Sequence, residues 1–241
     1  MSDYKPLIKD IFLRNGMDGL LTAPILQKLS DLINRTVSVN ENVNLTAITN
    51  GEDVALKHIA DSATIITHIP QNARLLDVGT GGGFPALPVA ILRPDVSVYA
   101  LDSTLKKLKT IDETVALLDI PNLKTVNGRA EELGKSVNYR ERFDVVTARA
   151  VSALNILTEL CIPFVKVGGT FISMKGSSAA EEITLARSGI IQLGGSSFKD
   201  EEFSLSYGET QLRRHIVISK KVKPTPPQFP RIYSRITKKP L

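Results

Sequence analysis

The stretch that decides the fold is LLDVGTGGGFPALPVAIL, residues 75–92, in which four glycines separate an apolar run from a segment with helical spacing. The run 73–78 predicts a short strand, and Pro85 suits the first turn of a helix. The glycines between them allow positive φ angles and a close approach of the backbone to a ligand. A strand end followed by a helix N-terminus is the usual ligand crevice of an open α/β sheet, so we expect a nucleotide-like ligand here.

From residue 73 onward, apolar strands alternate with amphipathic helices. The runs that predict the further parallel strands are 96–102, 123–128, 143–149 and 168–176. An antiparallel pair is expected near 202–207 and 213–221. This order predicts an α/β fold, with a mostly parallel seven-stranded sheet and helices on both faces.

Composition divides the chain into three parts. Residues 1–70 form an N-terminal helical extension, in which helices are expected at 4–16, 22–40 and 51–69 and a polar loop at 40–50. Residues 71–222 form the predicted α/β domain. Residues 223–241 are a basic, proline-rich tail, which should be extended rather than helical.

The bulk composition excludes several classes of protein. The 241-residue chain, with 42% hydrophobic and 23% charged residues, can bury a sizeable core. Cys161 is the only cysteine and has apolar neighbours, so we expect a buried side chain, no disulfide and no metal site. The N-terminus lacks the apolar core of a signal peptide, and no apolar run reaches the ~20 residues of a membrane span. We expect a cytoplasmic protein without membrane contact, and a monomer.

The charge is distributed unevenly. The net charge is +5, and no acidic residue follows Glu209, whereas nine basic residues do: Arg213, Arg214, Lys220, Lys221, Lys223, Arg231, Arg235, Lys238 and Lys239. A segment of one sign attracts a polyanion such as RNA. A solvated, partly flexible end is the alternative. With 5% aromatic residues and no tryptophan, a broad stacking platform for nucleic acid is not expected.

Three residues around the glycines narrow the choice of ligand. Asp102 ends the second strand, where a carboxylate can accept hydrogen bonds from both ribose hydroxyls. Phe84 stands where a dinucleotide fingerprint needs its third glycine. Asp77 precedes the loop and would repel a pyrophosphate but tolerate a cation. S-adenosylmethionine meets these conditions. Glycines that serve only a tight turn are the alternative.

The ordered motifs also resemble a known family. VGTGGGFPALPVAI and ALDS at 100–103 are similar to motifs one and two of Rossmann-like class I S-adenosylmethionine-dependent methyltransferases. The chain more narrowly resembles the small-subunit ribosomal RNA guanine-N7 methyltransferases, the glucose-inhibited division protein B family. The segments that carry this resemblance are NLTAIT at 44–49, KHIADS at 57–62, GRAEEL at 128–133, FDVVTARAVSALNIL at 143–157, FISMKG at 171–176 and the ending KKPL. One departure is PRIYSRI at 230–236, where the family often has a PRK-G-P run.

The resemblance implies methyl transfer from S-adenosylmethionine to N7 of a guanine in small-subunit (16S) ribosomal RNA, free or within a subunit. Residues 71–222 would then be the methyltransferase domain that binds the cofactor. Asp102 would hold the ribose, and Ala130 and Glu131 would flank the adenine. The full set of expected cofactor contacts is Asp77, Gly79, Gly81, Gly83, Phe84, Asp102, Ser103, Thr104, Ala130, Glu131 and Arg149.

The expected substrate contacts are Asn44, His58, Lys175, Arg213 and Arg214. Arg149 and Lys175, each at a strand end, are the candidates for positioning the reacting groups. Each has an alternative: a turn for Asn44, a surface or packing pair with Asp61 for His58, an ion pair for Arg149 and a solvated side chain for Lys175. We expect His68 and His215 to be incidental, and Lys106, Lys107 and Lys109 to form a solvated helix face.

The implied chemistry needs placement rather than a base. Guanine N7 has a free lone pair at neutral pH, so no proton has to leave before it attacks the methyl group. Catalysis should come from in-line placement of N7 and the methyl group within ~3–3.5 Å. The alternatives are a methyltransferase with another substrate, an NAD-dependent oxidoreductase, which Phe84 disfavours, and an RNA-binding protein with a vestigial loop.

Overall fold

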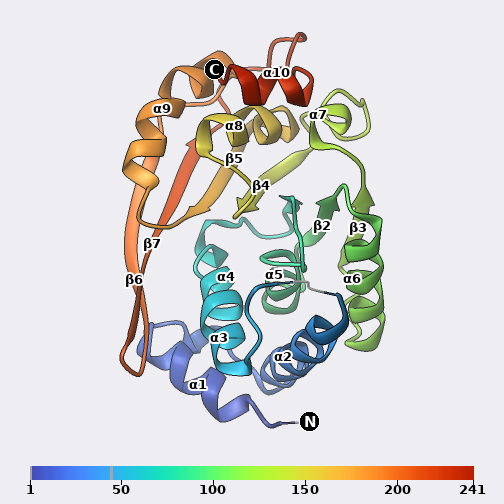
Figure 1. Cartoon of the computed structure of the whole chain (residues 1–241), viewed down its shortest axis with the longest axis vertical. Helices are drawn as coiled ribbons and strands as arrows, with labels where there is room; N and C mark the ends of the chain where they lie inside the picture. Colours follow the sequence, from blue (N-terminus) through green and yellow to red (C-terminus); the bar gives the residue numbers. More distant parts are fainter. Residues whose placement is uncertain (1, 44–45) are drawn as a thin grey trace.

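The computed structural model describes residues 2–43 and 46–241. Its centre is a seven-stranded sheet in the order β3-β2-β1-β4-β5-β7-β6 (Figure 1). Five strands run parallel, and β7 is antiparallel to both β5 and β6, which confirms the predicted mixed sheet. The strands are β1 Arg74–Val78, β2 Ser97–Asp102, β3 Leu123–Asn127, β4 Phe143–Arg149, β5 Val165–Lys175, β6 Lys199–Tyr207 and β7 Thr210–Lys220.

One face of the sheet is covered by the N-terminal helices together with α5 and α6, and their apolar side chains form one continuous core. In chain order these elements are α1 Lys5–Arg14, η1 Asp18–Leu20, α2 Ala23–Val43, α3 Gly51–Val54, the π-helical segment η2 Ala55–Ala60, α4 Asp61–Ala63, η3 Ile66–His68, α5 Ala86–Leu92 and α6 Leu105–Leu117. The division of the chain at residues 70/71 and 222/223 stays a prediction.

The predicted loop at 40–50 is wrong at its start, because α2 continues to Val43. Adding a residue to an existing helix gains a hydrogen bond at little cost, so polar residues can extend it. Asn40 also finds a partner beyond the helix, since its Oδ1 accepts from the backbone N–H of Thr46 at 2.8 Å. The predicted loop therefore begins later than its asparagine-rich composition suggests.

The opposite face carries four further helices around a second core. They are α7 Ala130–Leu133, α8 Leu154–Cys161, followed by the 3-10 turn η4 Ile162–Phe164, α9 Ala179–Gln192 and α10 Tyr233–Lys238. Cys161 is fully buried there, as predicted. Among the described residues, no helix is both long and apolar enough to cross a membrane.

The prediction of an extended tail is wrong at its end, where α10 forms. Ile236 of this helix is fully buried in the second core. Just before the helix, Arg231 donates from Nη2 to the Glu159 carboxylate at 2.6 Å, and Arg140 donates from Nη1 to the Phe229 carbonyl at 2.7 Å. A six-residue helix is not stable alone, so these packing contacts, rather than local composition, produce it.

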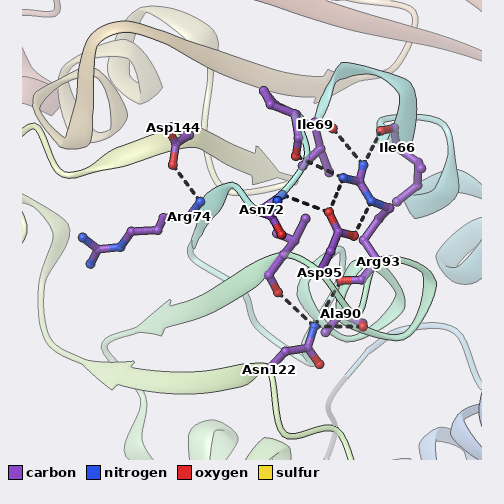
Figure 2. Close-up of polar contacts among 11 residues, drawn as sticks. Ile66, Ile69, Asn72, Arg74, Ala90, Arg93, Asp95, Asn122 and Asp144 are labelled. Carbon is purple, nitrogen blue, oxygen red and sulfur yellow. Dashed lines mark hydrogen bonds and ion pairs between the residues drawn. The ribbon is translucent and has the colours of Figure 1, made fainter.

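A polar cluster ties the strands together at the edge where they begin (Figure 2). Arg93 forms an ion pair with Asp95 at 2.7 Å and donates to the Ile69 carbonyl at 2.8 Å, which fixes the end of the N-terminal helices. The Asn122 amide donates to three carbonyls, those of Ala90, Arg93 and Val96, at 2.9 to 3.2 Å. The candidate site lies at the opposite edge of the sheet, where the parallel strands end.

Candidate functional site

A cavity of about 410 Å³ lies at the carboxyl ends of the parallel strands. This is where an open α/β sheet places its ligand. Most of the predicted cofactor contacts line it: Gly79, Gly81, Phe84, Asp102, Ser103, Ala130, Glu131 and Arg149. His58, predicted to contact substrate, lines it too. The structure thus brings these residues together, although their contact with a ligand stays a prediction.

The glycine loop has the shape that the sequence suggested. Gly79 has a φ of +72° and Gly83 a φ of +90°, which side chains rarely tolerate. A Cβ on Gly79 would lie 2.6 Å from a methyl carbon of Val151, and a Cβ on Gly83 would lie 2.5 Å from Leu87. Gly83 does not reach the cavity. It serves the packing of α5 against the loop, whereas Gly79 leaves the cavity floor open.

Asp102 connects the loop to the second strand. Its Oδ2 accepts from the backbone N–H of Gly81 at 3.0 Å, and its Oδ1 accepts from that of Thr104 at 2.8 Å. Each carboxylate oxygen has a further lone pair. Asp102 therefore shapes the loop and can still accept from a vicinal diol in the cavity. Thr104 holds this carboxylate through its backbone N–H and does not line the cavity.

Asp77 lies beneath the loop and does not line the cavity, contrary to the expected contact with a cationic ligand. It is paired in register with Thr147 of β4, so the two side chains share a face of the sheet, and the Thr147 hydroxyl donates to Asp77 at 3.2 Å. Its Oδ2 is buried without a partner among the described residues. Burial raises the pKa of Asp77 to about 6, although the hydroxyls of Thr80 and Thr147 and the charge of Arg149 act to lower it.

His58 packs directly against the glycine loop. Its ring stacks on Phe84 with centroids 4.4 Å apart, and its Nδ1 is 2.9 Å from Nη2 of Arg149. Nδ1 also lies 3.1 Å from the Lys57 carbonyl, and Nε2 lies 2.8 Å from the Thr46 hydroxyl, so both ring nitrogens have a hydrogen-bonding partner. Burial, aided by the Arg149 charge, lowers the pKa of His58 to about 3. The ring is therefore neutral at pH 7 and is a buried packing residue, not a surface one.

Asp61 links two arginines that are far apart in the sequence. Its Oδ2 accepts from Nη1 of Arg149 and its Oδ1 from Nε of Arg214, both at 3.0 Å. The Asp61 side chain is only 5% exposed, so this double pairing neutralises an otherwise costly buried charge. Arg149, which lines the cavity, is thereby tied to Arg214 of β7.

A second cavity of about 310 Å³ adjoins the first, and the two share Arg149 and Ala150 in their walls. Lys175, predicted as a substrate contact, lines this second cavity, as do Arg214, Glu182 and His215. Lys175 is not solvated, because its Nζ pairs with Glu182 at 2.7 Å and donates to the Ser152 carbonyl at 2.7 Å.

His215 and His68, both expected to be incidental, each have an acidic partner in the structure. Nδ1 of His215 lies 3.0 Å from Asp200 on the neighbouring strand, and its buried Nε2 has no partner in the described part of the chain. His68 pairs with Glu201 at 3.2 Å. The contact between His215 and Asp200 results from strand pairing in the β6–β7 hairpin, so no local sequence pattern predicts it.

Among the predicted substrate residues that the structure describes, Arg213 does not line either cavity. Arg213 pairs with Glu202 on the exposed hairpin, at 2.6 Å. Asn44 lies outside the described residues. Several further residues line the first cavity although they were not among the predicted site residues: Thr46, Lys107, Gly128, Arg129, Val151 and Tyr233. Of these, Lys107 is expected from the sequence to lie on a solvated helix face. The apolar residues Ile232, Tyr233 and Ile236 have helical spacing, but the prolines around them hide this pattern.

Solved structures with the same fold are methyltransferases of low sequence similarity. An S-adenosylmethionine-dependent O-methyltransferase from Thermotoga maritima matches with a TM-score of 0.52 at 13% identity, over 79% of this chain and 72% of the other. TYW2 of M. jannaschii, solved in complex with AdoMet, matches with a TM-score of 0.52 at 15% identity, over 67% and 74%. At this identity the likeness shows the fold alone.

Sequence comparison is more specific. The family model of GidB, described as rRNA small subunit methyltransferase G, matches residues 25–212. The ribosomal RNA small subunit methyltransferase G of Clostridium novyi is 42% identical over 204 residues, 84% of this chain and 83% of that protein. The protein of the same name from Alkaliphilus oremlandii is 38% identical over 239 residues, 97% and 99%. The chain therefore belongs to the rRNA small subunit methyltransferase G family.

Proposed function

We propose that the chain transfers a methyl group from S-adenosylmethionine to N7 of a guanine in small-subunit ribosomal RNA. Membership of the family supports the activity and the class of RNA. The observation in the structure that carries the proposal is the pair of adjoining cavities with Arg149 and Ala150 in their common wall. Two cavities that meet at a shared wall suit a reaction between two bound molecules.

The first cavity fits S-adenosylmethionine in size and in its polar groups. The strand order β3-β2-β1-β4 arranges the cavity from one end to the other. Asp102, after β2, would accept from the ribose, and the backbone after β3, at Ala130 and Glu131, would border the adenine. The amino-acid part would follow the loop at Gly79 and Gly81 toward β4. When bound, the cofactor supplies a methyl group that its sulfonium activates.

The target base would enter the second cavity. Guanine presents two acceptors, N7 and O6, on its Hoogsteen edge, and these suit cationic donors. Arg149, Lys175 and Arg214 surround this cavity, and Arg149 also reaches the first one. Donors to O6 would aim N7 at the methyl group without blocking its lone pair. The residues of the chain thus act by orientation, which is worth several orders of magnitude in rate.

No general base is needed for this reaction, which agrees with the state of His58. Its lowered pKa keeps the ring neutral, but Nδ1 is occupied by Arg149 and Nε2 by Thr46. We infer that His58 fixes the Arg149 guanidinium and the Phe84 ring instead of moving a proton. The predicted role of His58 in substrate binding is then indirect.

The RNA must present the base outside a regular helix, because the Hoogsteen edge is hidden in the narrow major groove of an A-form duplex. Exposed cations of the β6–β7 hairpin and of the C-terminal segment could bind phosphates without regard to sequence; they include Arg213, Arg235, Lys238 and Lys239. We further propose that the protein acts as a monomer in the cytoplasm, where ribosomal subunits are found.

The direct test is transfer of a labelled methyl group to small ribosomal subunits, naked 16S RNA and large-subunit RNA, with the modified nucleotide mapped by cleavage at N7-methylguanine. We expect one guanine of the small-subunit RNA to be labelled. Arg149→Lys keeps the charge but loses the fork that holds His58 and Asp61, so its kcat should fall at least 10-fold. Arg93→Lys, at the far edge of the sheet, is the matched control. Labelling of a protein, or binding of a nicotinamide dinucleotide in place of S-adenosylmethionine, would contradict the proposal.

A further inference from the structure

Tyr233, in the C-terminal helix α10, lines the first cavity although it lies more than one hundred residues beyond the expected adenine contacts. Its side chain is 44% exposed, unlike the buried neighbours that hold the helix in place. We propose that Tyr233 forms the adenine-side wall of the cofactor site, with its ring against the face of the base. This inference rests on the proposed cofactor, and it makes the C-terminal tail part of the site.

The position of Tyr233 is fixed on both sides. Two residues earlier, Arg231 holds the fully buried Glu159 through its backbone N–H, Nε and Nη2 at 2.6 to 3.1 Å. Three residues later, Ile236 is fully buried against the second core. The segment between these anchors has little freedom, so its one aromatic ring is held at the cavity before any ligand arrives. An ordered ring costs less entropy on binding than a mobile one.

The tail is attached at the adenine end of the cavity. A Cβ on Gly134, directly after α7, would lie 3.1 Å from Cγ of Pro230, so the tail touches the turn that follows Ala130 and Glu131. Arg140 joins the same two segments, because its Nη1 donates to the carbonyls of Gly134 and Phe229 at 2.9 and 2.7 Å. In Figure 1, α10 lies beside α7 and α8. The methyl end of the ligand must instead face β4 and the second cavity.

The chemistry of this wall suits a flat base. Leu101, Leu160 and Ala130 contribute apolar surface to the cavity near Asp102. An aromatic ring opposite such a surface can stack on adenine while its hydroxyl stays in water. A stacked pair of aromatic rings adds enough free energy to change a binding constant about 3- to 10-fold.

The test compares three variants by calorimetry with S-adenosylmethionine and with adenosine. Tyr233→Ala should weaken both ligands by the same factor, about 3- to 10-fold, because the adenine is common to them. Tyr233→Phe keeps the ring and should stay within about twofold. Ile232→Ala removes a neighbouring side chain that is 57% exposed and does not line the cavity, so it is the matched control and should bind like the wild type.

A spectroscopic readout separates contact from a structural effect. The chain has five tyrosines and no tryptophan, so tyrosine emission can be followed directly. If adenine stacks on Tyr233, the ligand should quench this emission in the wild type and quench it less in Tyr233→Phe, which still binds. Thermal melting of each variant checks that it is folded.

The outcomes that overturn the inference are distinct from failure of the proposed function. Normal binding of S-adenosylmethionine by the wild type and by Tyr233→Ala would show that the ring does not touch the cofactor. If the KM for RNA rises in that variant while cofactor affinity is unchanged, the ring faces RNA instead, and the inference is wrong. A wild type that binds no S-adenosylmethionine would overturn the proposed function together with this inference.

Discussion

The ring of His58 lies 4.4 Å from that of Phe84, centroid to centroid, with the two planes inclined by 21°. This stack joins the N-terminal helical segment to the glycine loop of the sheet. Arg149 adds to it, because its guanidinium carbon lies 5.8 Å from the centroid of the Phe84 ring and its Nη2 meets His58. The N-terminal segment therefore forms part of the wall of the first cavity, and a substitution in it should alter the shape of that cavity.

His58→Ala should destabilise the protein by about 2–4 kcal/mol, because it removes a stacked ring and leaves hydrogen-bonding groups of Arg149 and Thr46 without a partner. Cofactor affinity should fall with it, since Phe84 loses its support. Urea unfolding and calorimetry measure the two effects. His68→Ala is the control, because His68 pairs with Glu201 nearer the surface and should cost less than about 1 kcal/mol. Equal losses in both variants would show that the stack is unimportant.

Asp102→Asn should weaken S-adenosylmethionine binding about 10- to 100-fold. The amide can replace only one of the two acceptors that hold the N–H groups of Gly81 and Thr104, and hydrogen bonds to a charged group are worth about 1.5–3 kcal/mol. Asp112→Asn is a matched control, since Asp112 lies on α6, accepts from the Thr125 hydroxyl of β3 and does not line the cavity. Calorimetry measures the Kd for S-adenosylmethionine in both variants. An unchanged Kd in Asp102→Asn would show that this carboxylate does not bind the cofactor.

Arg93→Met should lower stability and leave the cofactor untouched. The variant removes the ion pair with Asp95 and the hydrogen bond to the Ile69 carbonyl, and it should cost about 2–3 kcal/mol because acceptors that are part-buried lose their donor (Figure 2). The cluster lies at the edge of the sheet opposite the cavities. Chemical denaturation should show the loss, while Kd for S-adenosylmethionine stays within about twofold once the protein is folded. A large change in Kd would mean that the two edges are coupled.

Asp77→Asn should alter the pH dependence of stability. Burial raises the folded-state pKa of Asp77 to about 6 from an ordinary 3.8, so between these values the folded state holds a proton that the unfolded state has released. The free energy of unfolding therefore falls as pH rises through this window, by about 3 kcal/mol in total. Asparagine stays neutral and escapes this loss. The stability of the variant relative to wild type should thus increase between pH 4 and pH 7.

Asp144→Asn provides a control of opposite sign. Burial raises the pKa of Asp144, but Lys166 and the backbone N–H of Arg74 outweigh it and hold the pKa below its ordinary value. The stability from this carboxylate is present near neutral pH and is lost as pH falls. Unfolding of the cofactor-free proteins across this pH range distinguishes the two, and parallel curves for wild type and Asp77→Asn would contradict the assigned burial effect.

The parts of the site that could be predicted are those with a local cause. A strand, glycines and a helix start follow one another within residues 73–92, and each is set by neighbours in the chain. Asp102 was predictable for the same reason, because the end of a strand is a local event. The sequence predicts that Asp77 lies at the start of the loop, but it does not predict the direction of its side chain. Pairing of β1 with β4 places the carboxylate beside Thr147 and away from the cavity.

The parts that could not be predicted depend on contacts between distant segments. Thr46 is held at the cavity by contacts with Asn40 and His58, and His215 meets Asp200 only through pairing of the last two strands. The tail was predicted to be extended because proline and charge dominate its composition. Burial of Ile236 and the Arg231–Glu159 pair outweighed that local preference and formed a helix.

The sequence by itself determined the α/β fold, the glycine loop, Asp102 and, through its ordered motifs, the methyltransferase family, because periodicity and turn chemistry act over a few residues. Tertiary structure alone decided which side chains close the cavity. It placed Asp61 between Arg149 and Arg214, opened a second cavity beside the first and brought Tyr233 to the wall of the first cavity. These contacts join residues separated by as many as 153 positions, and only packing of the whole chain can bring such residues together.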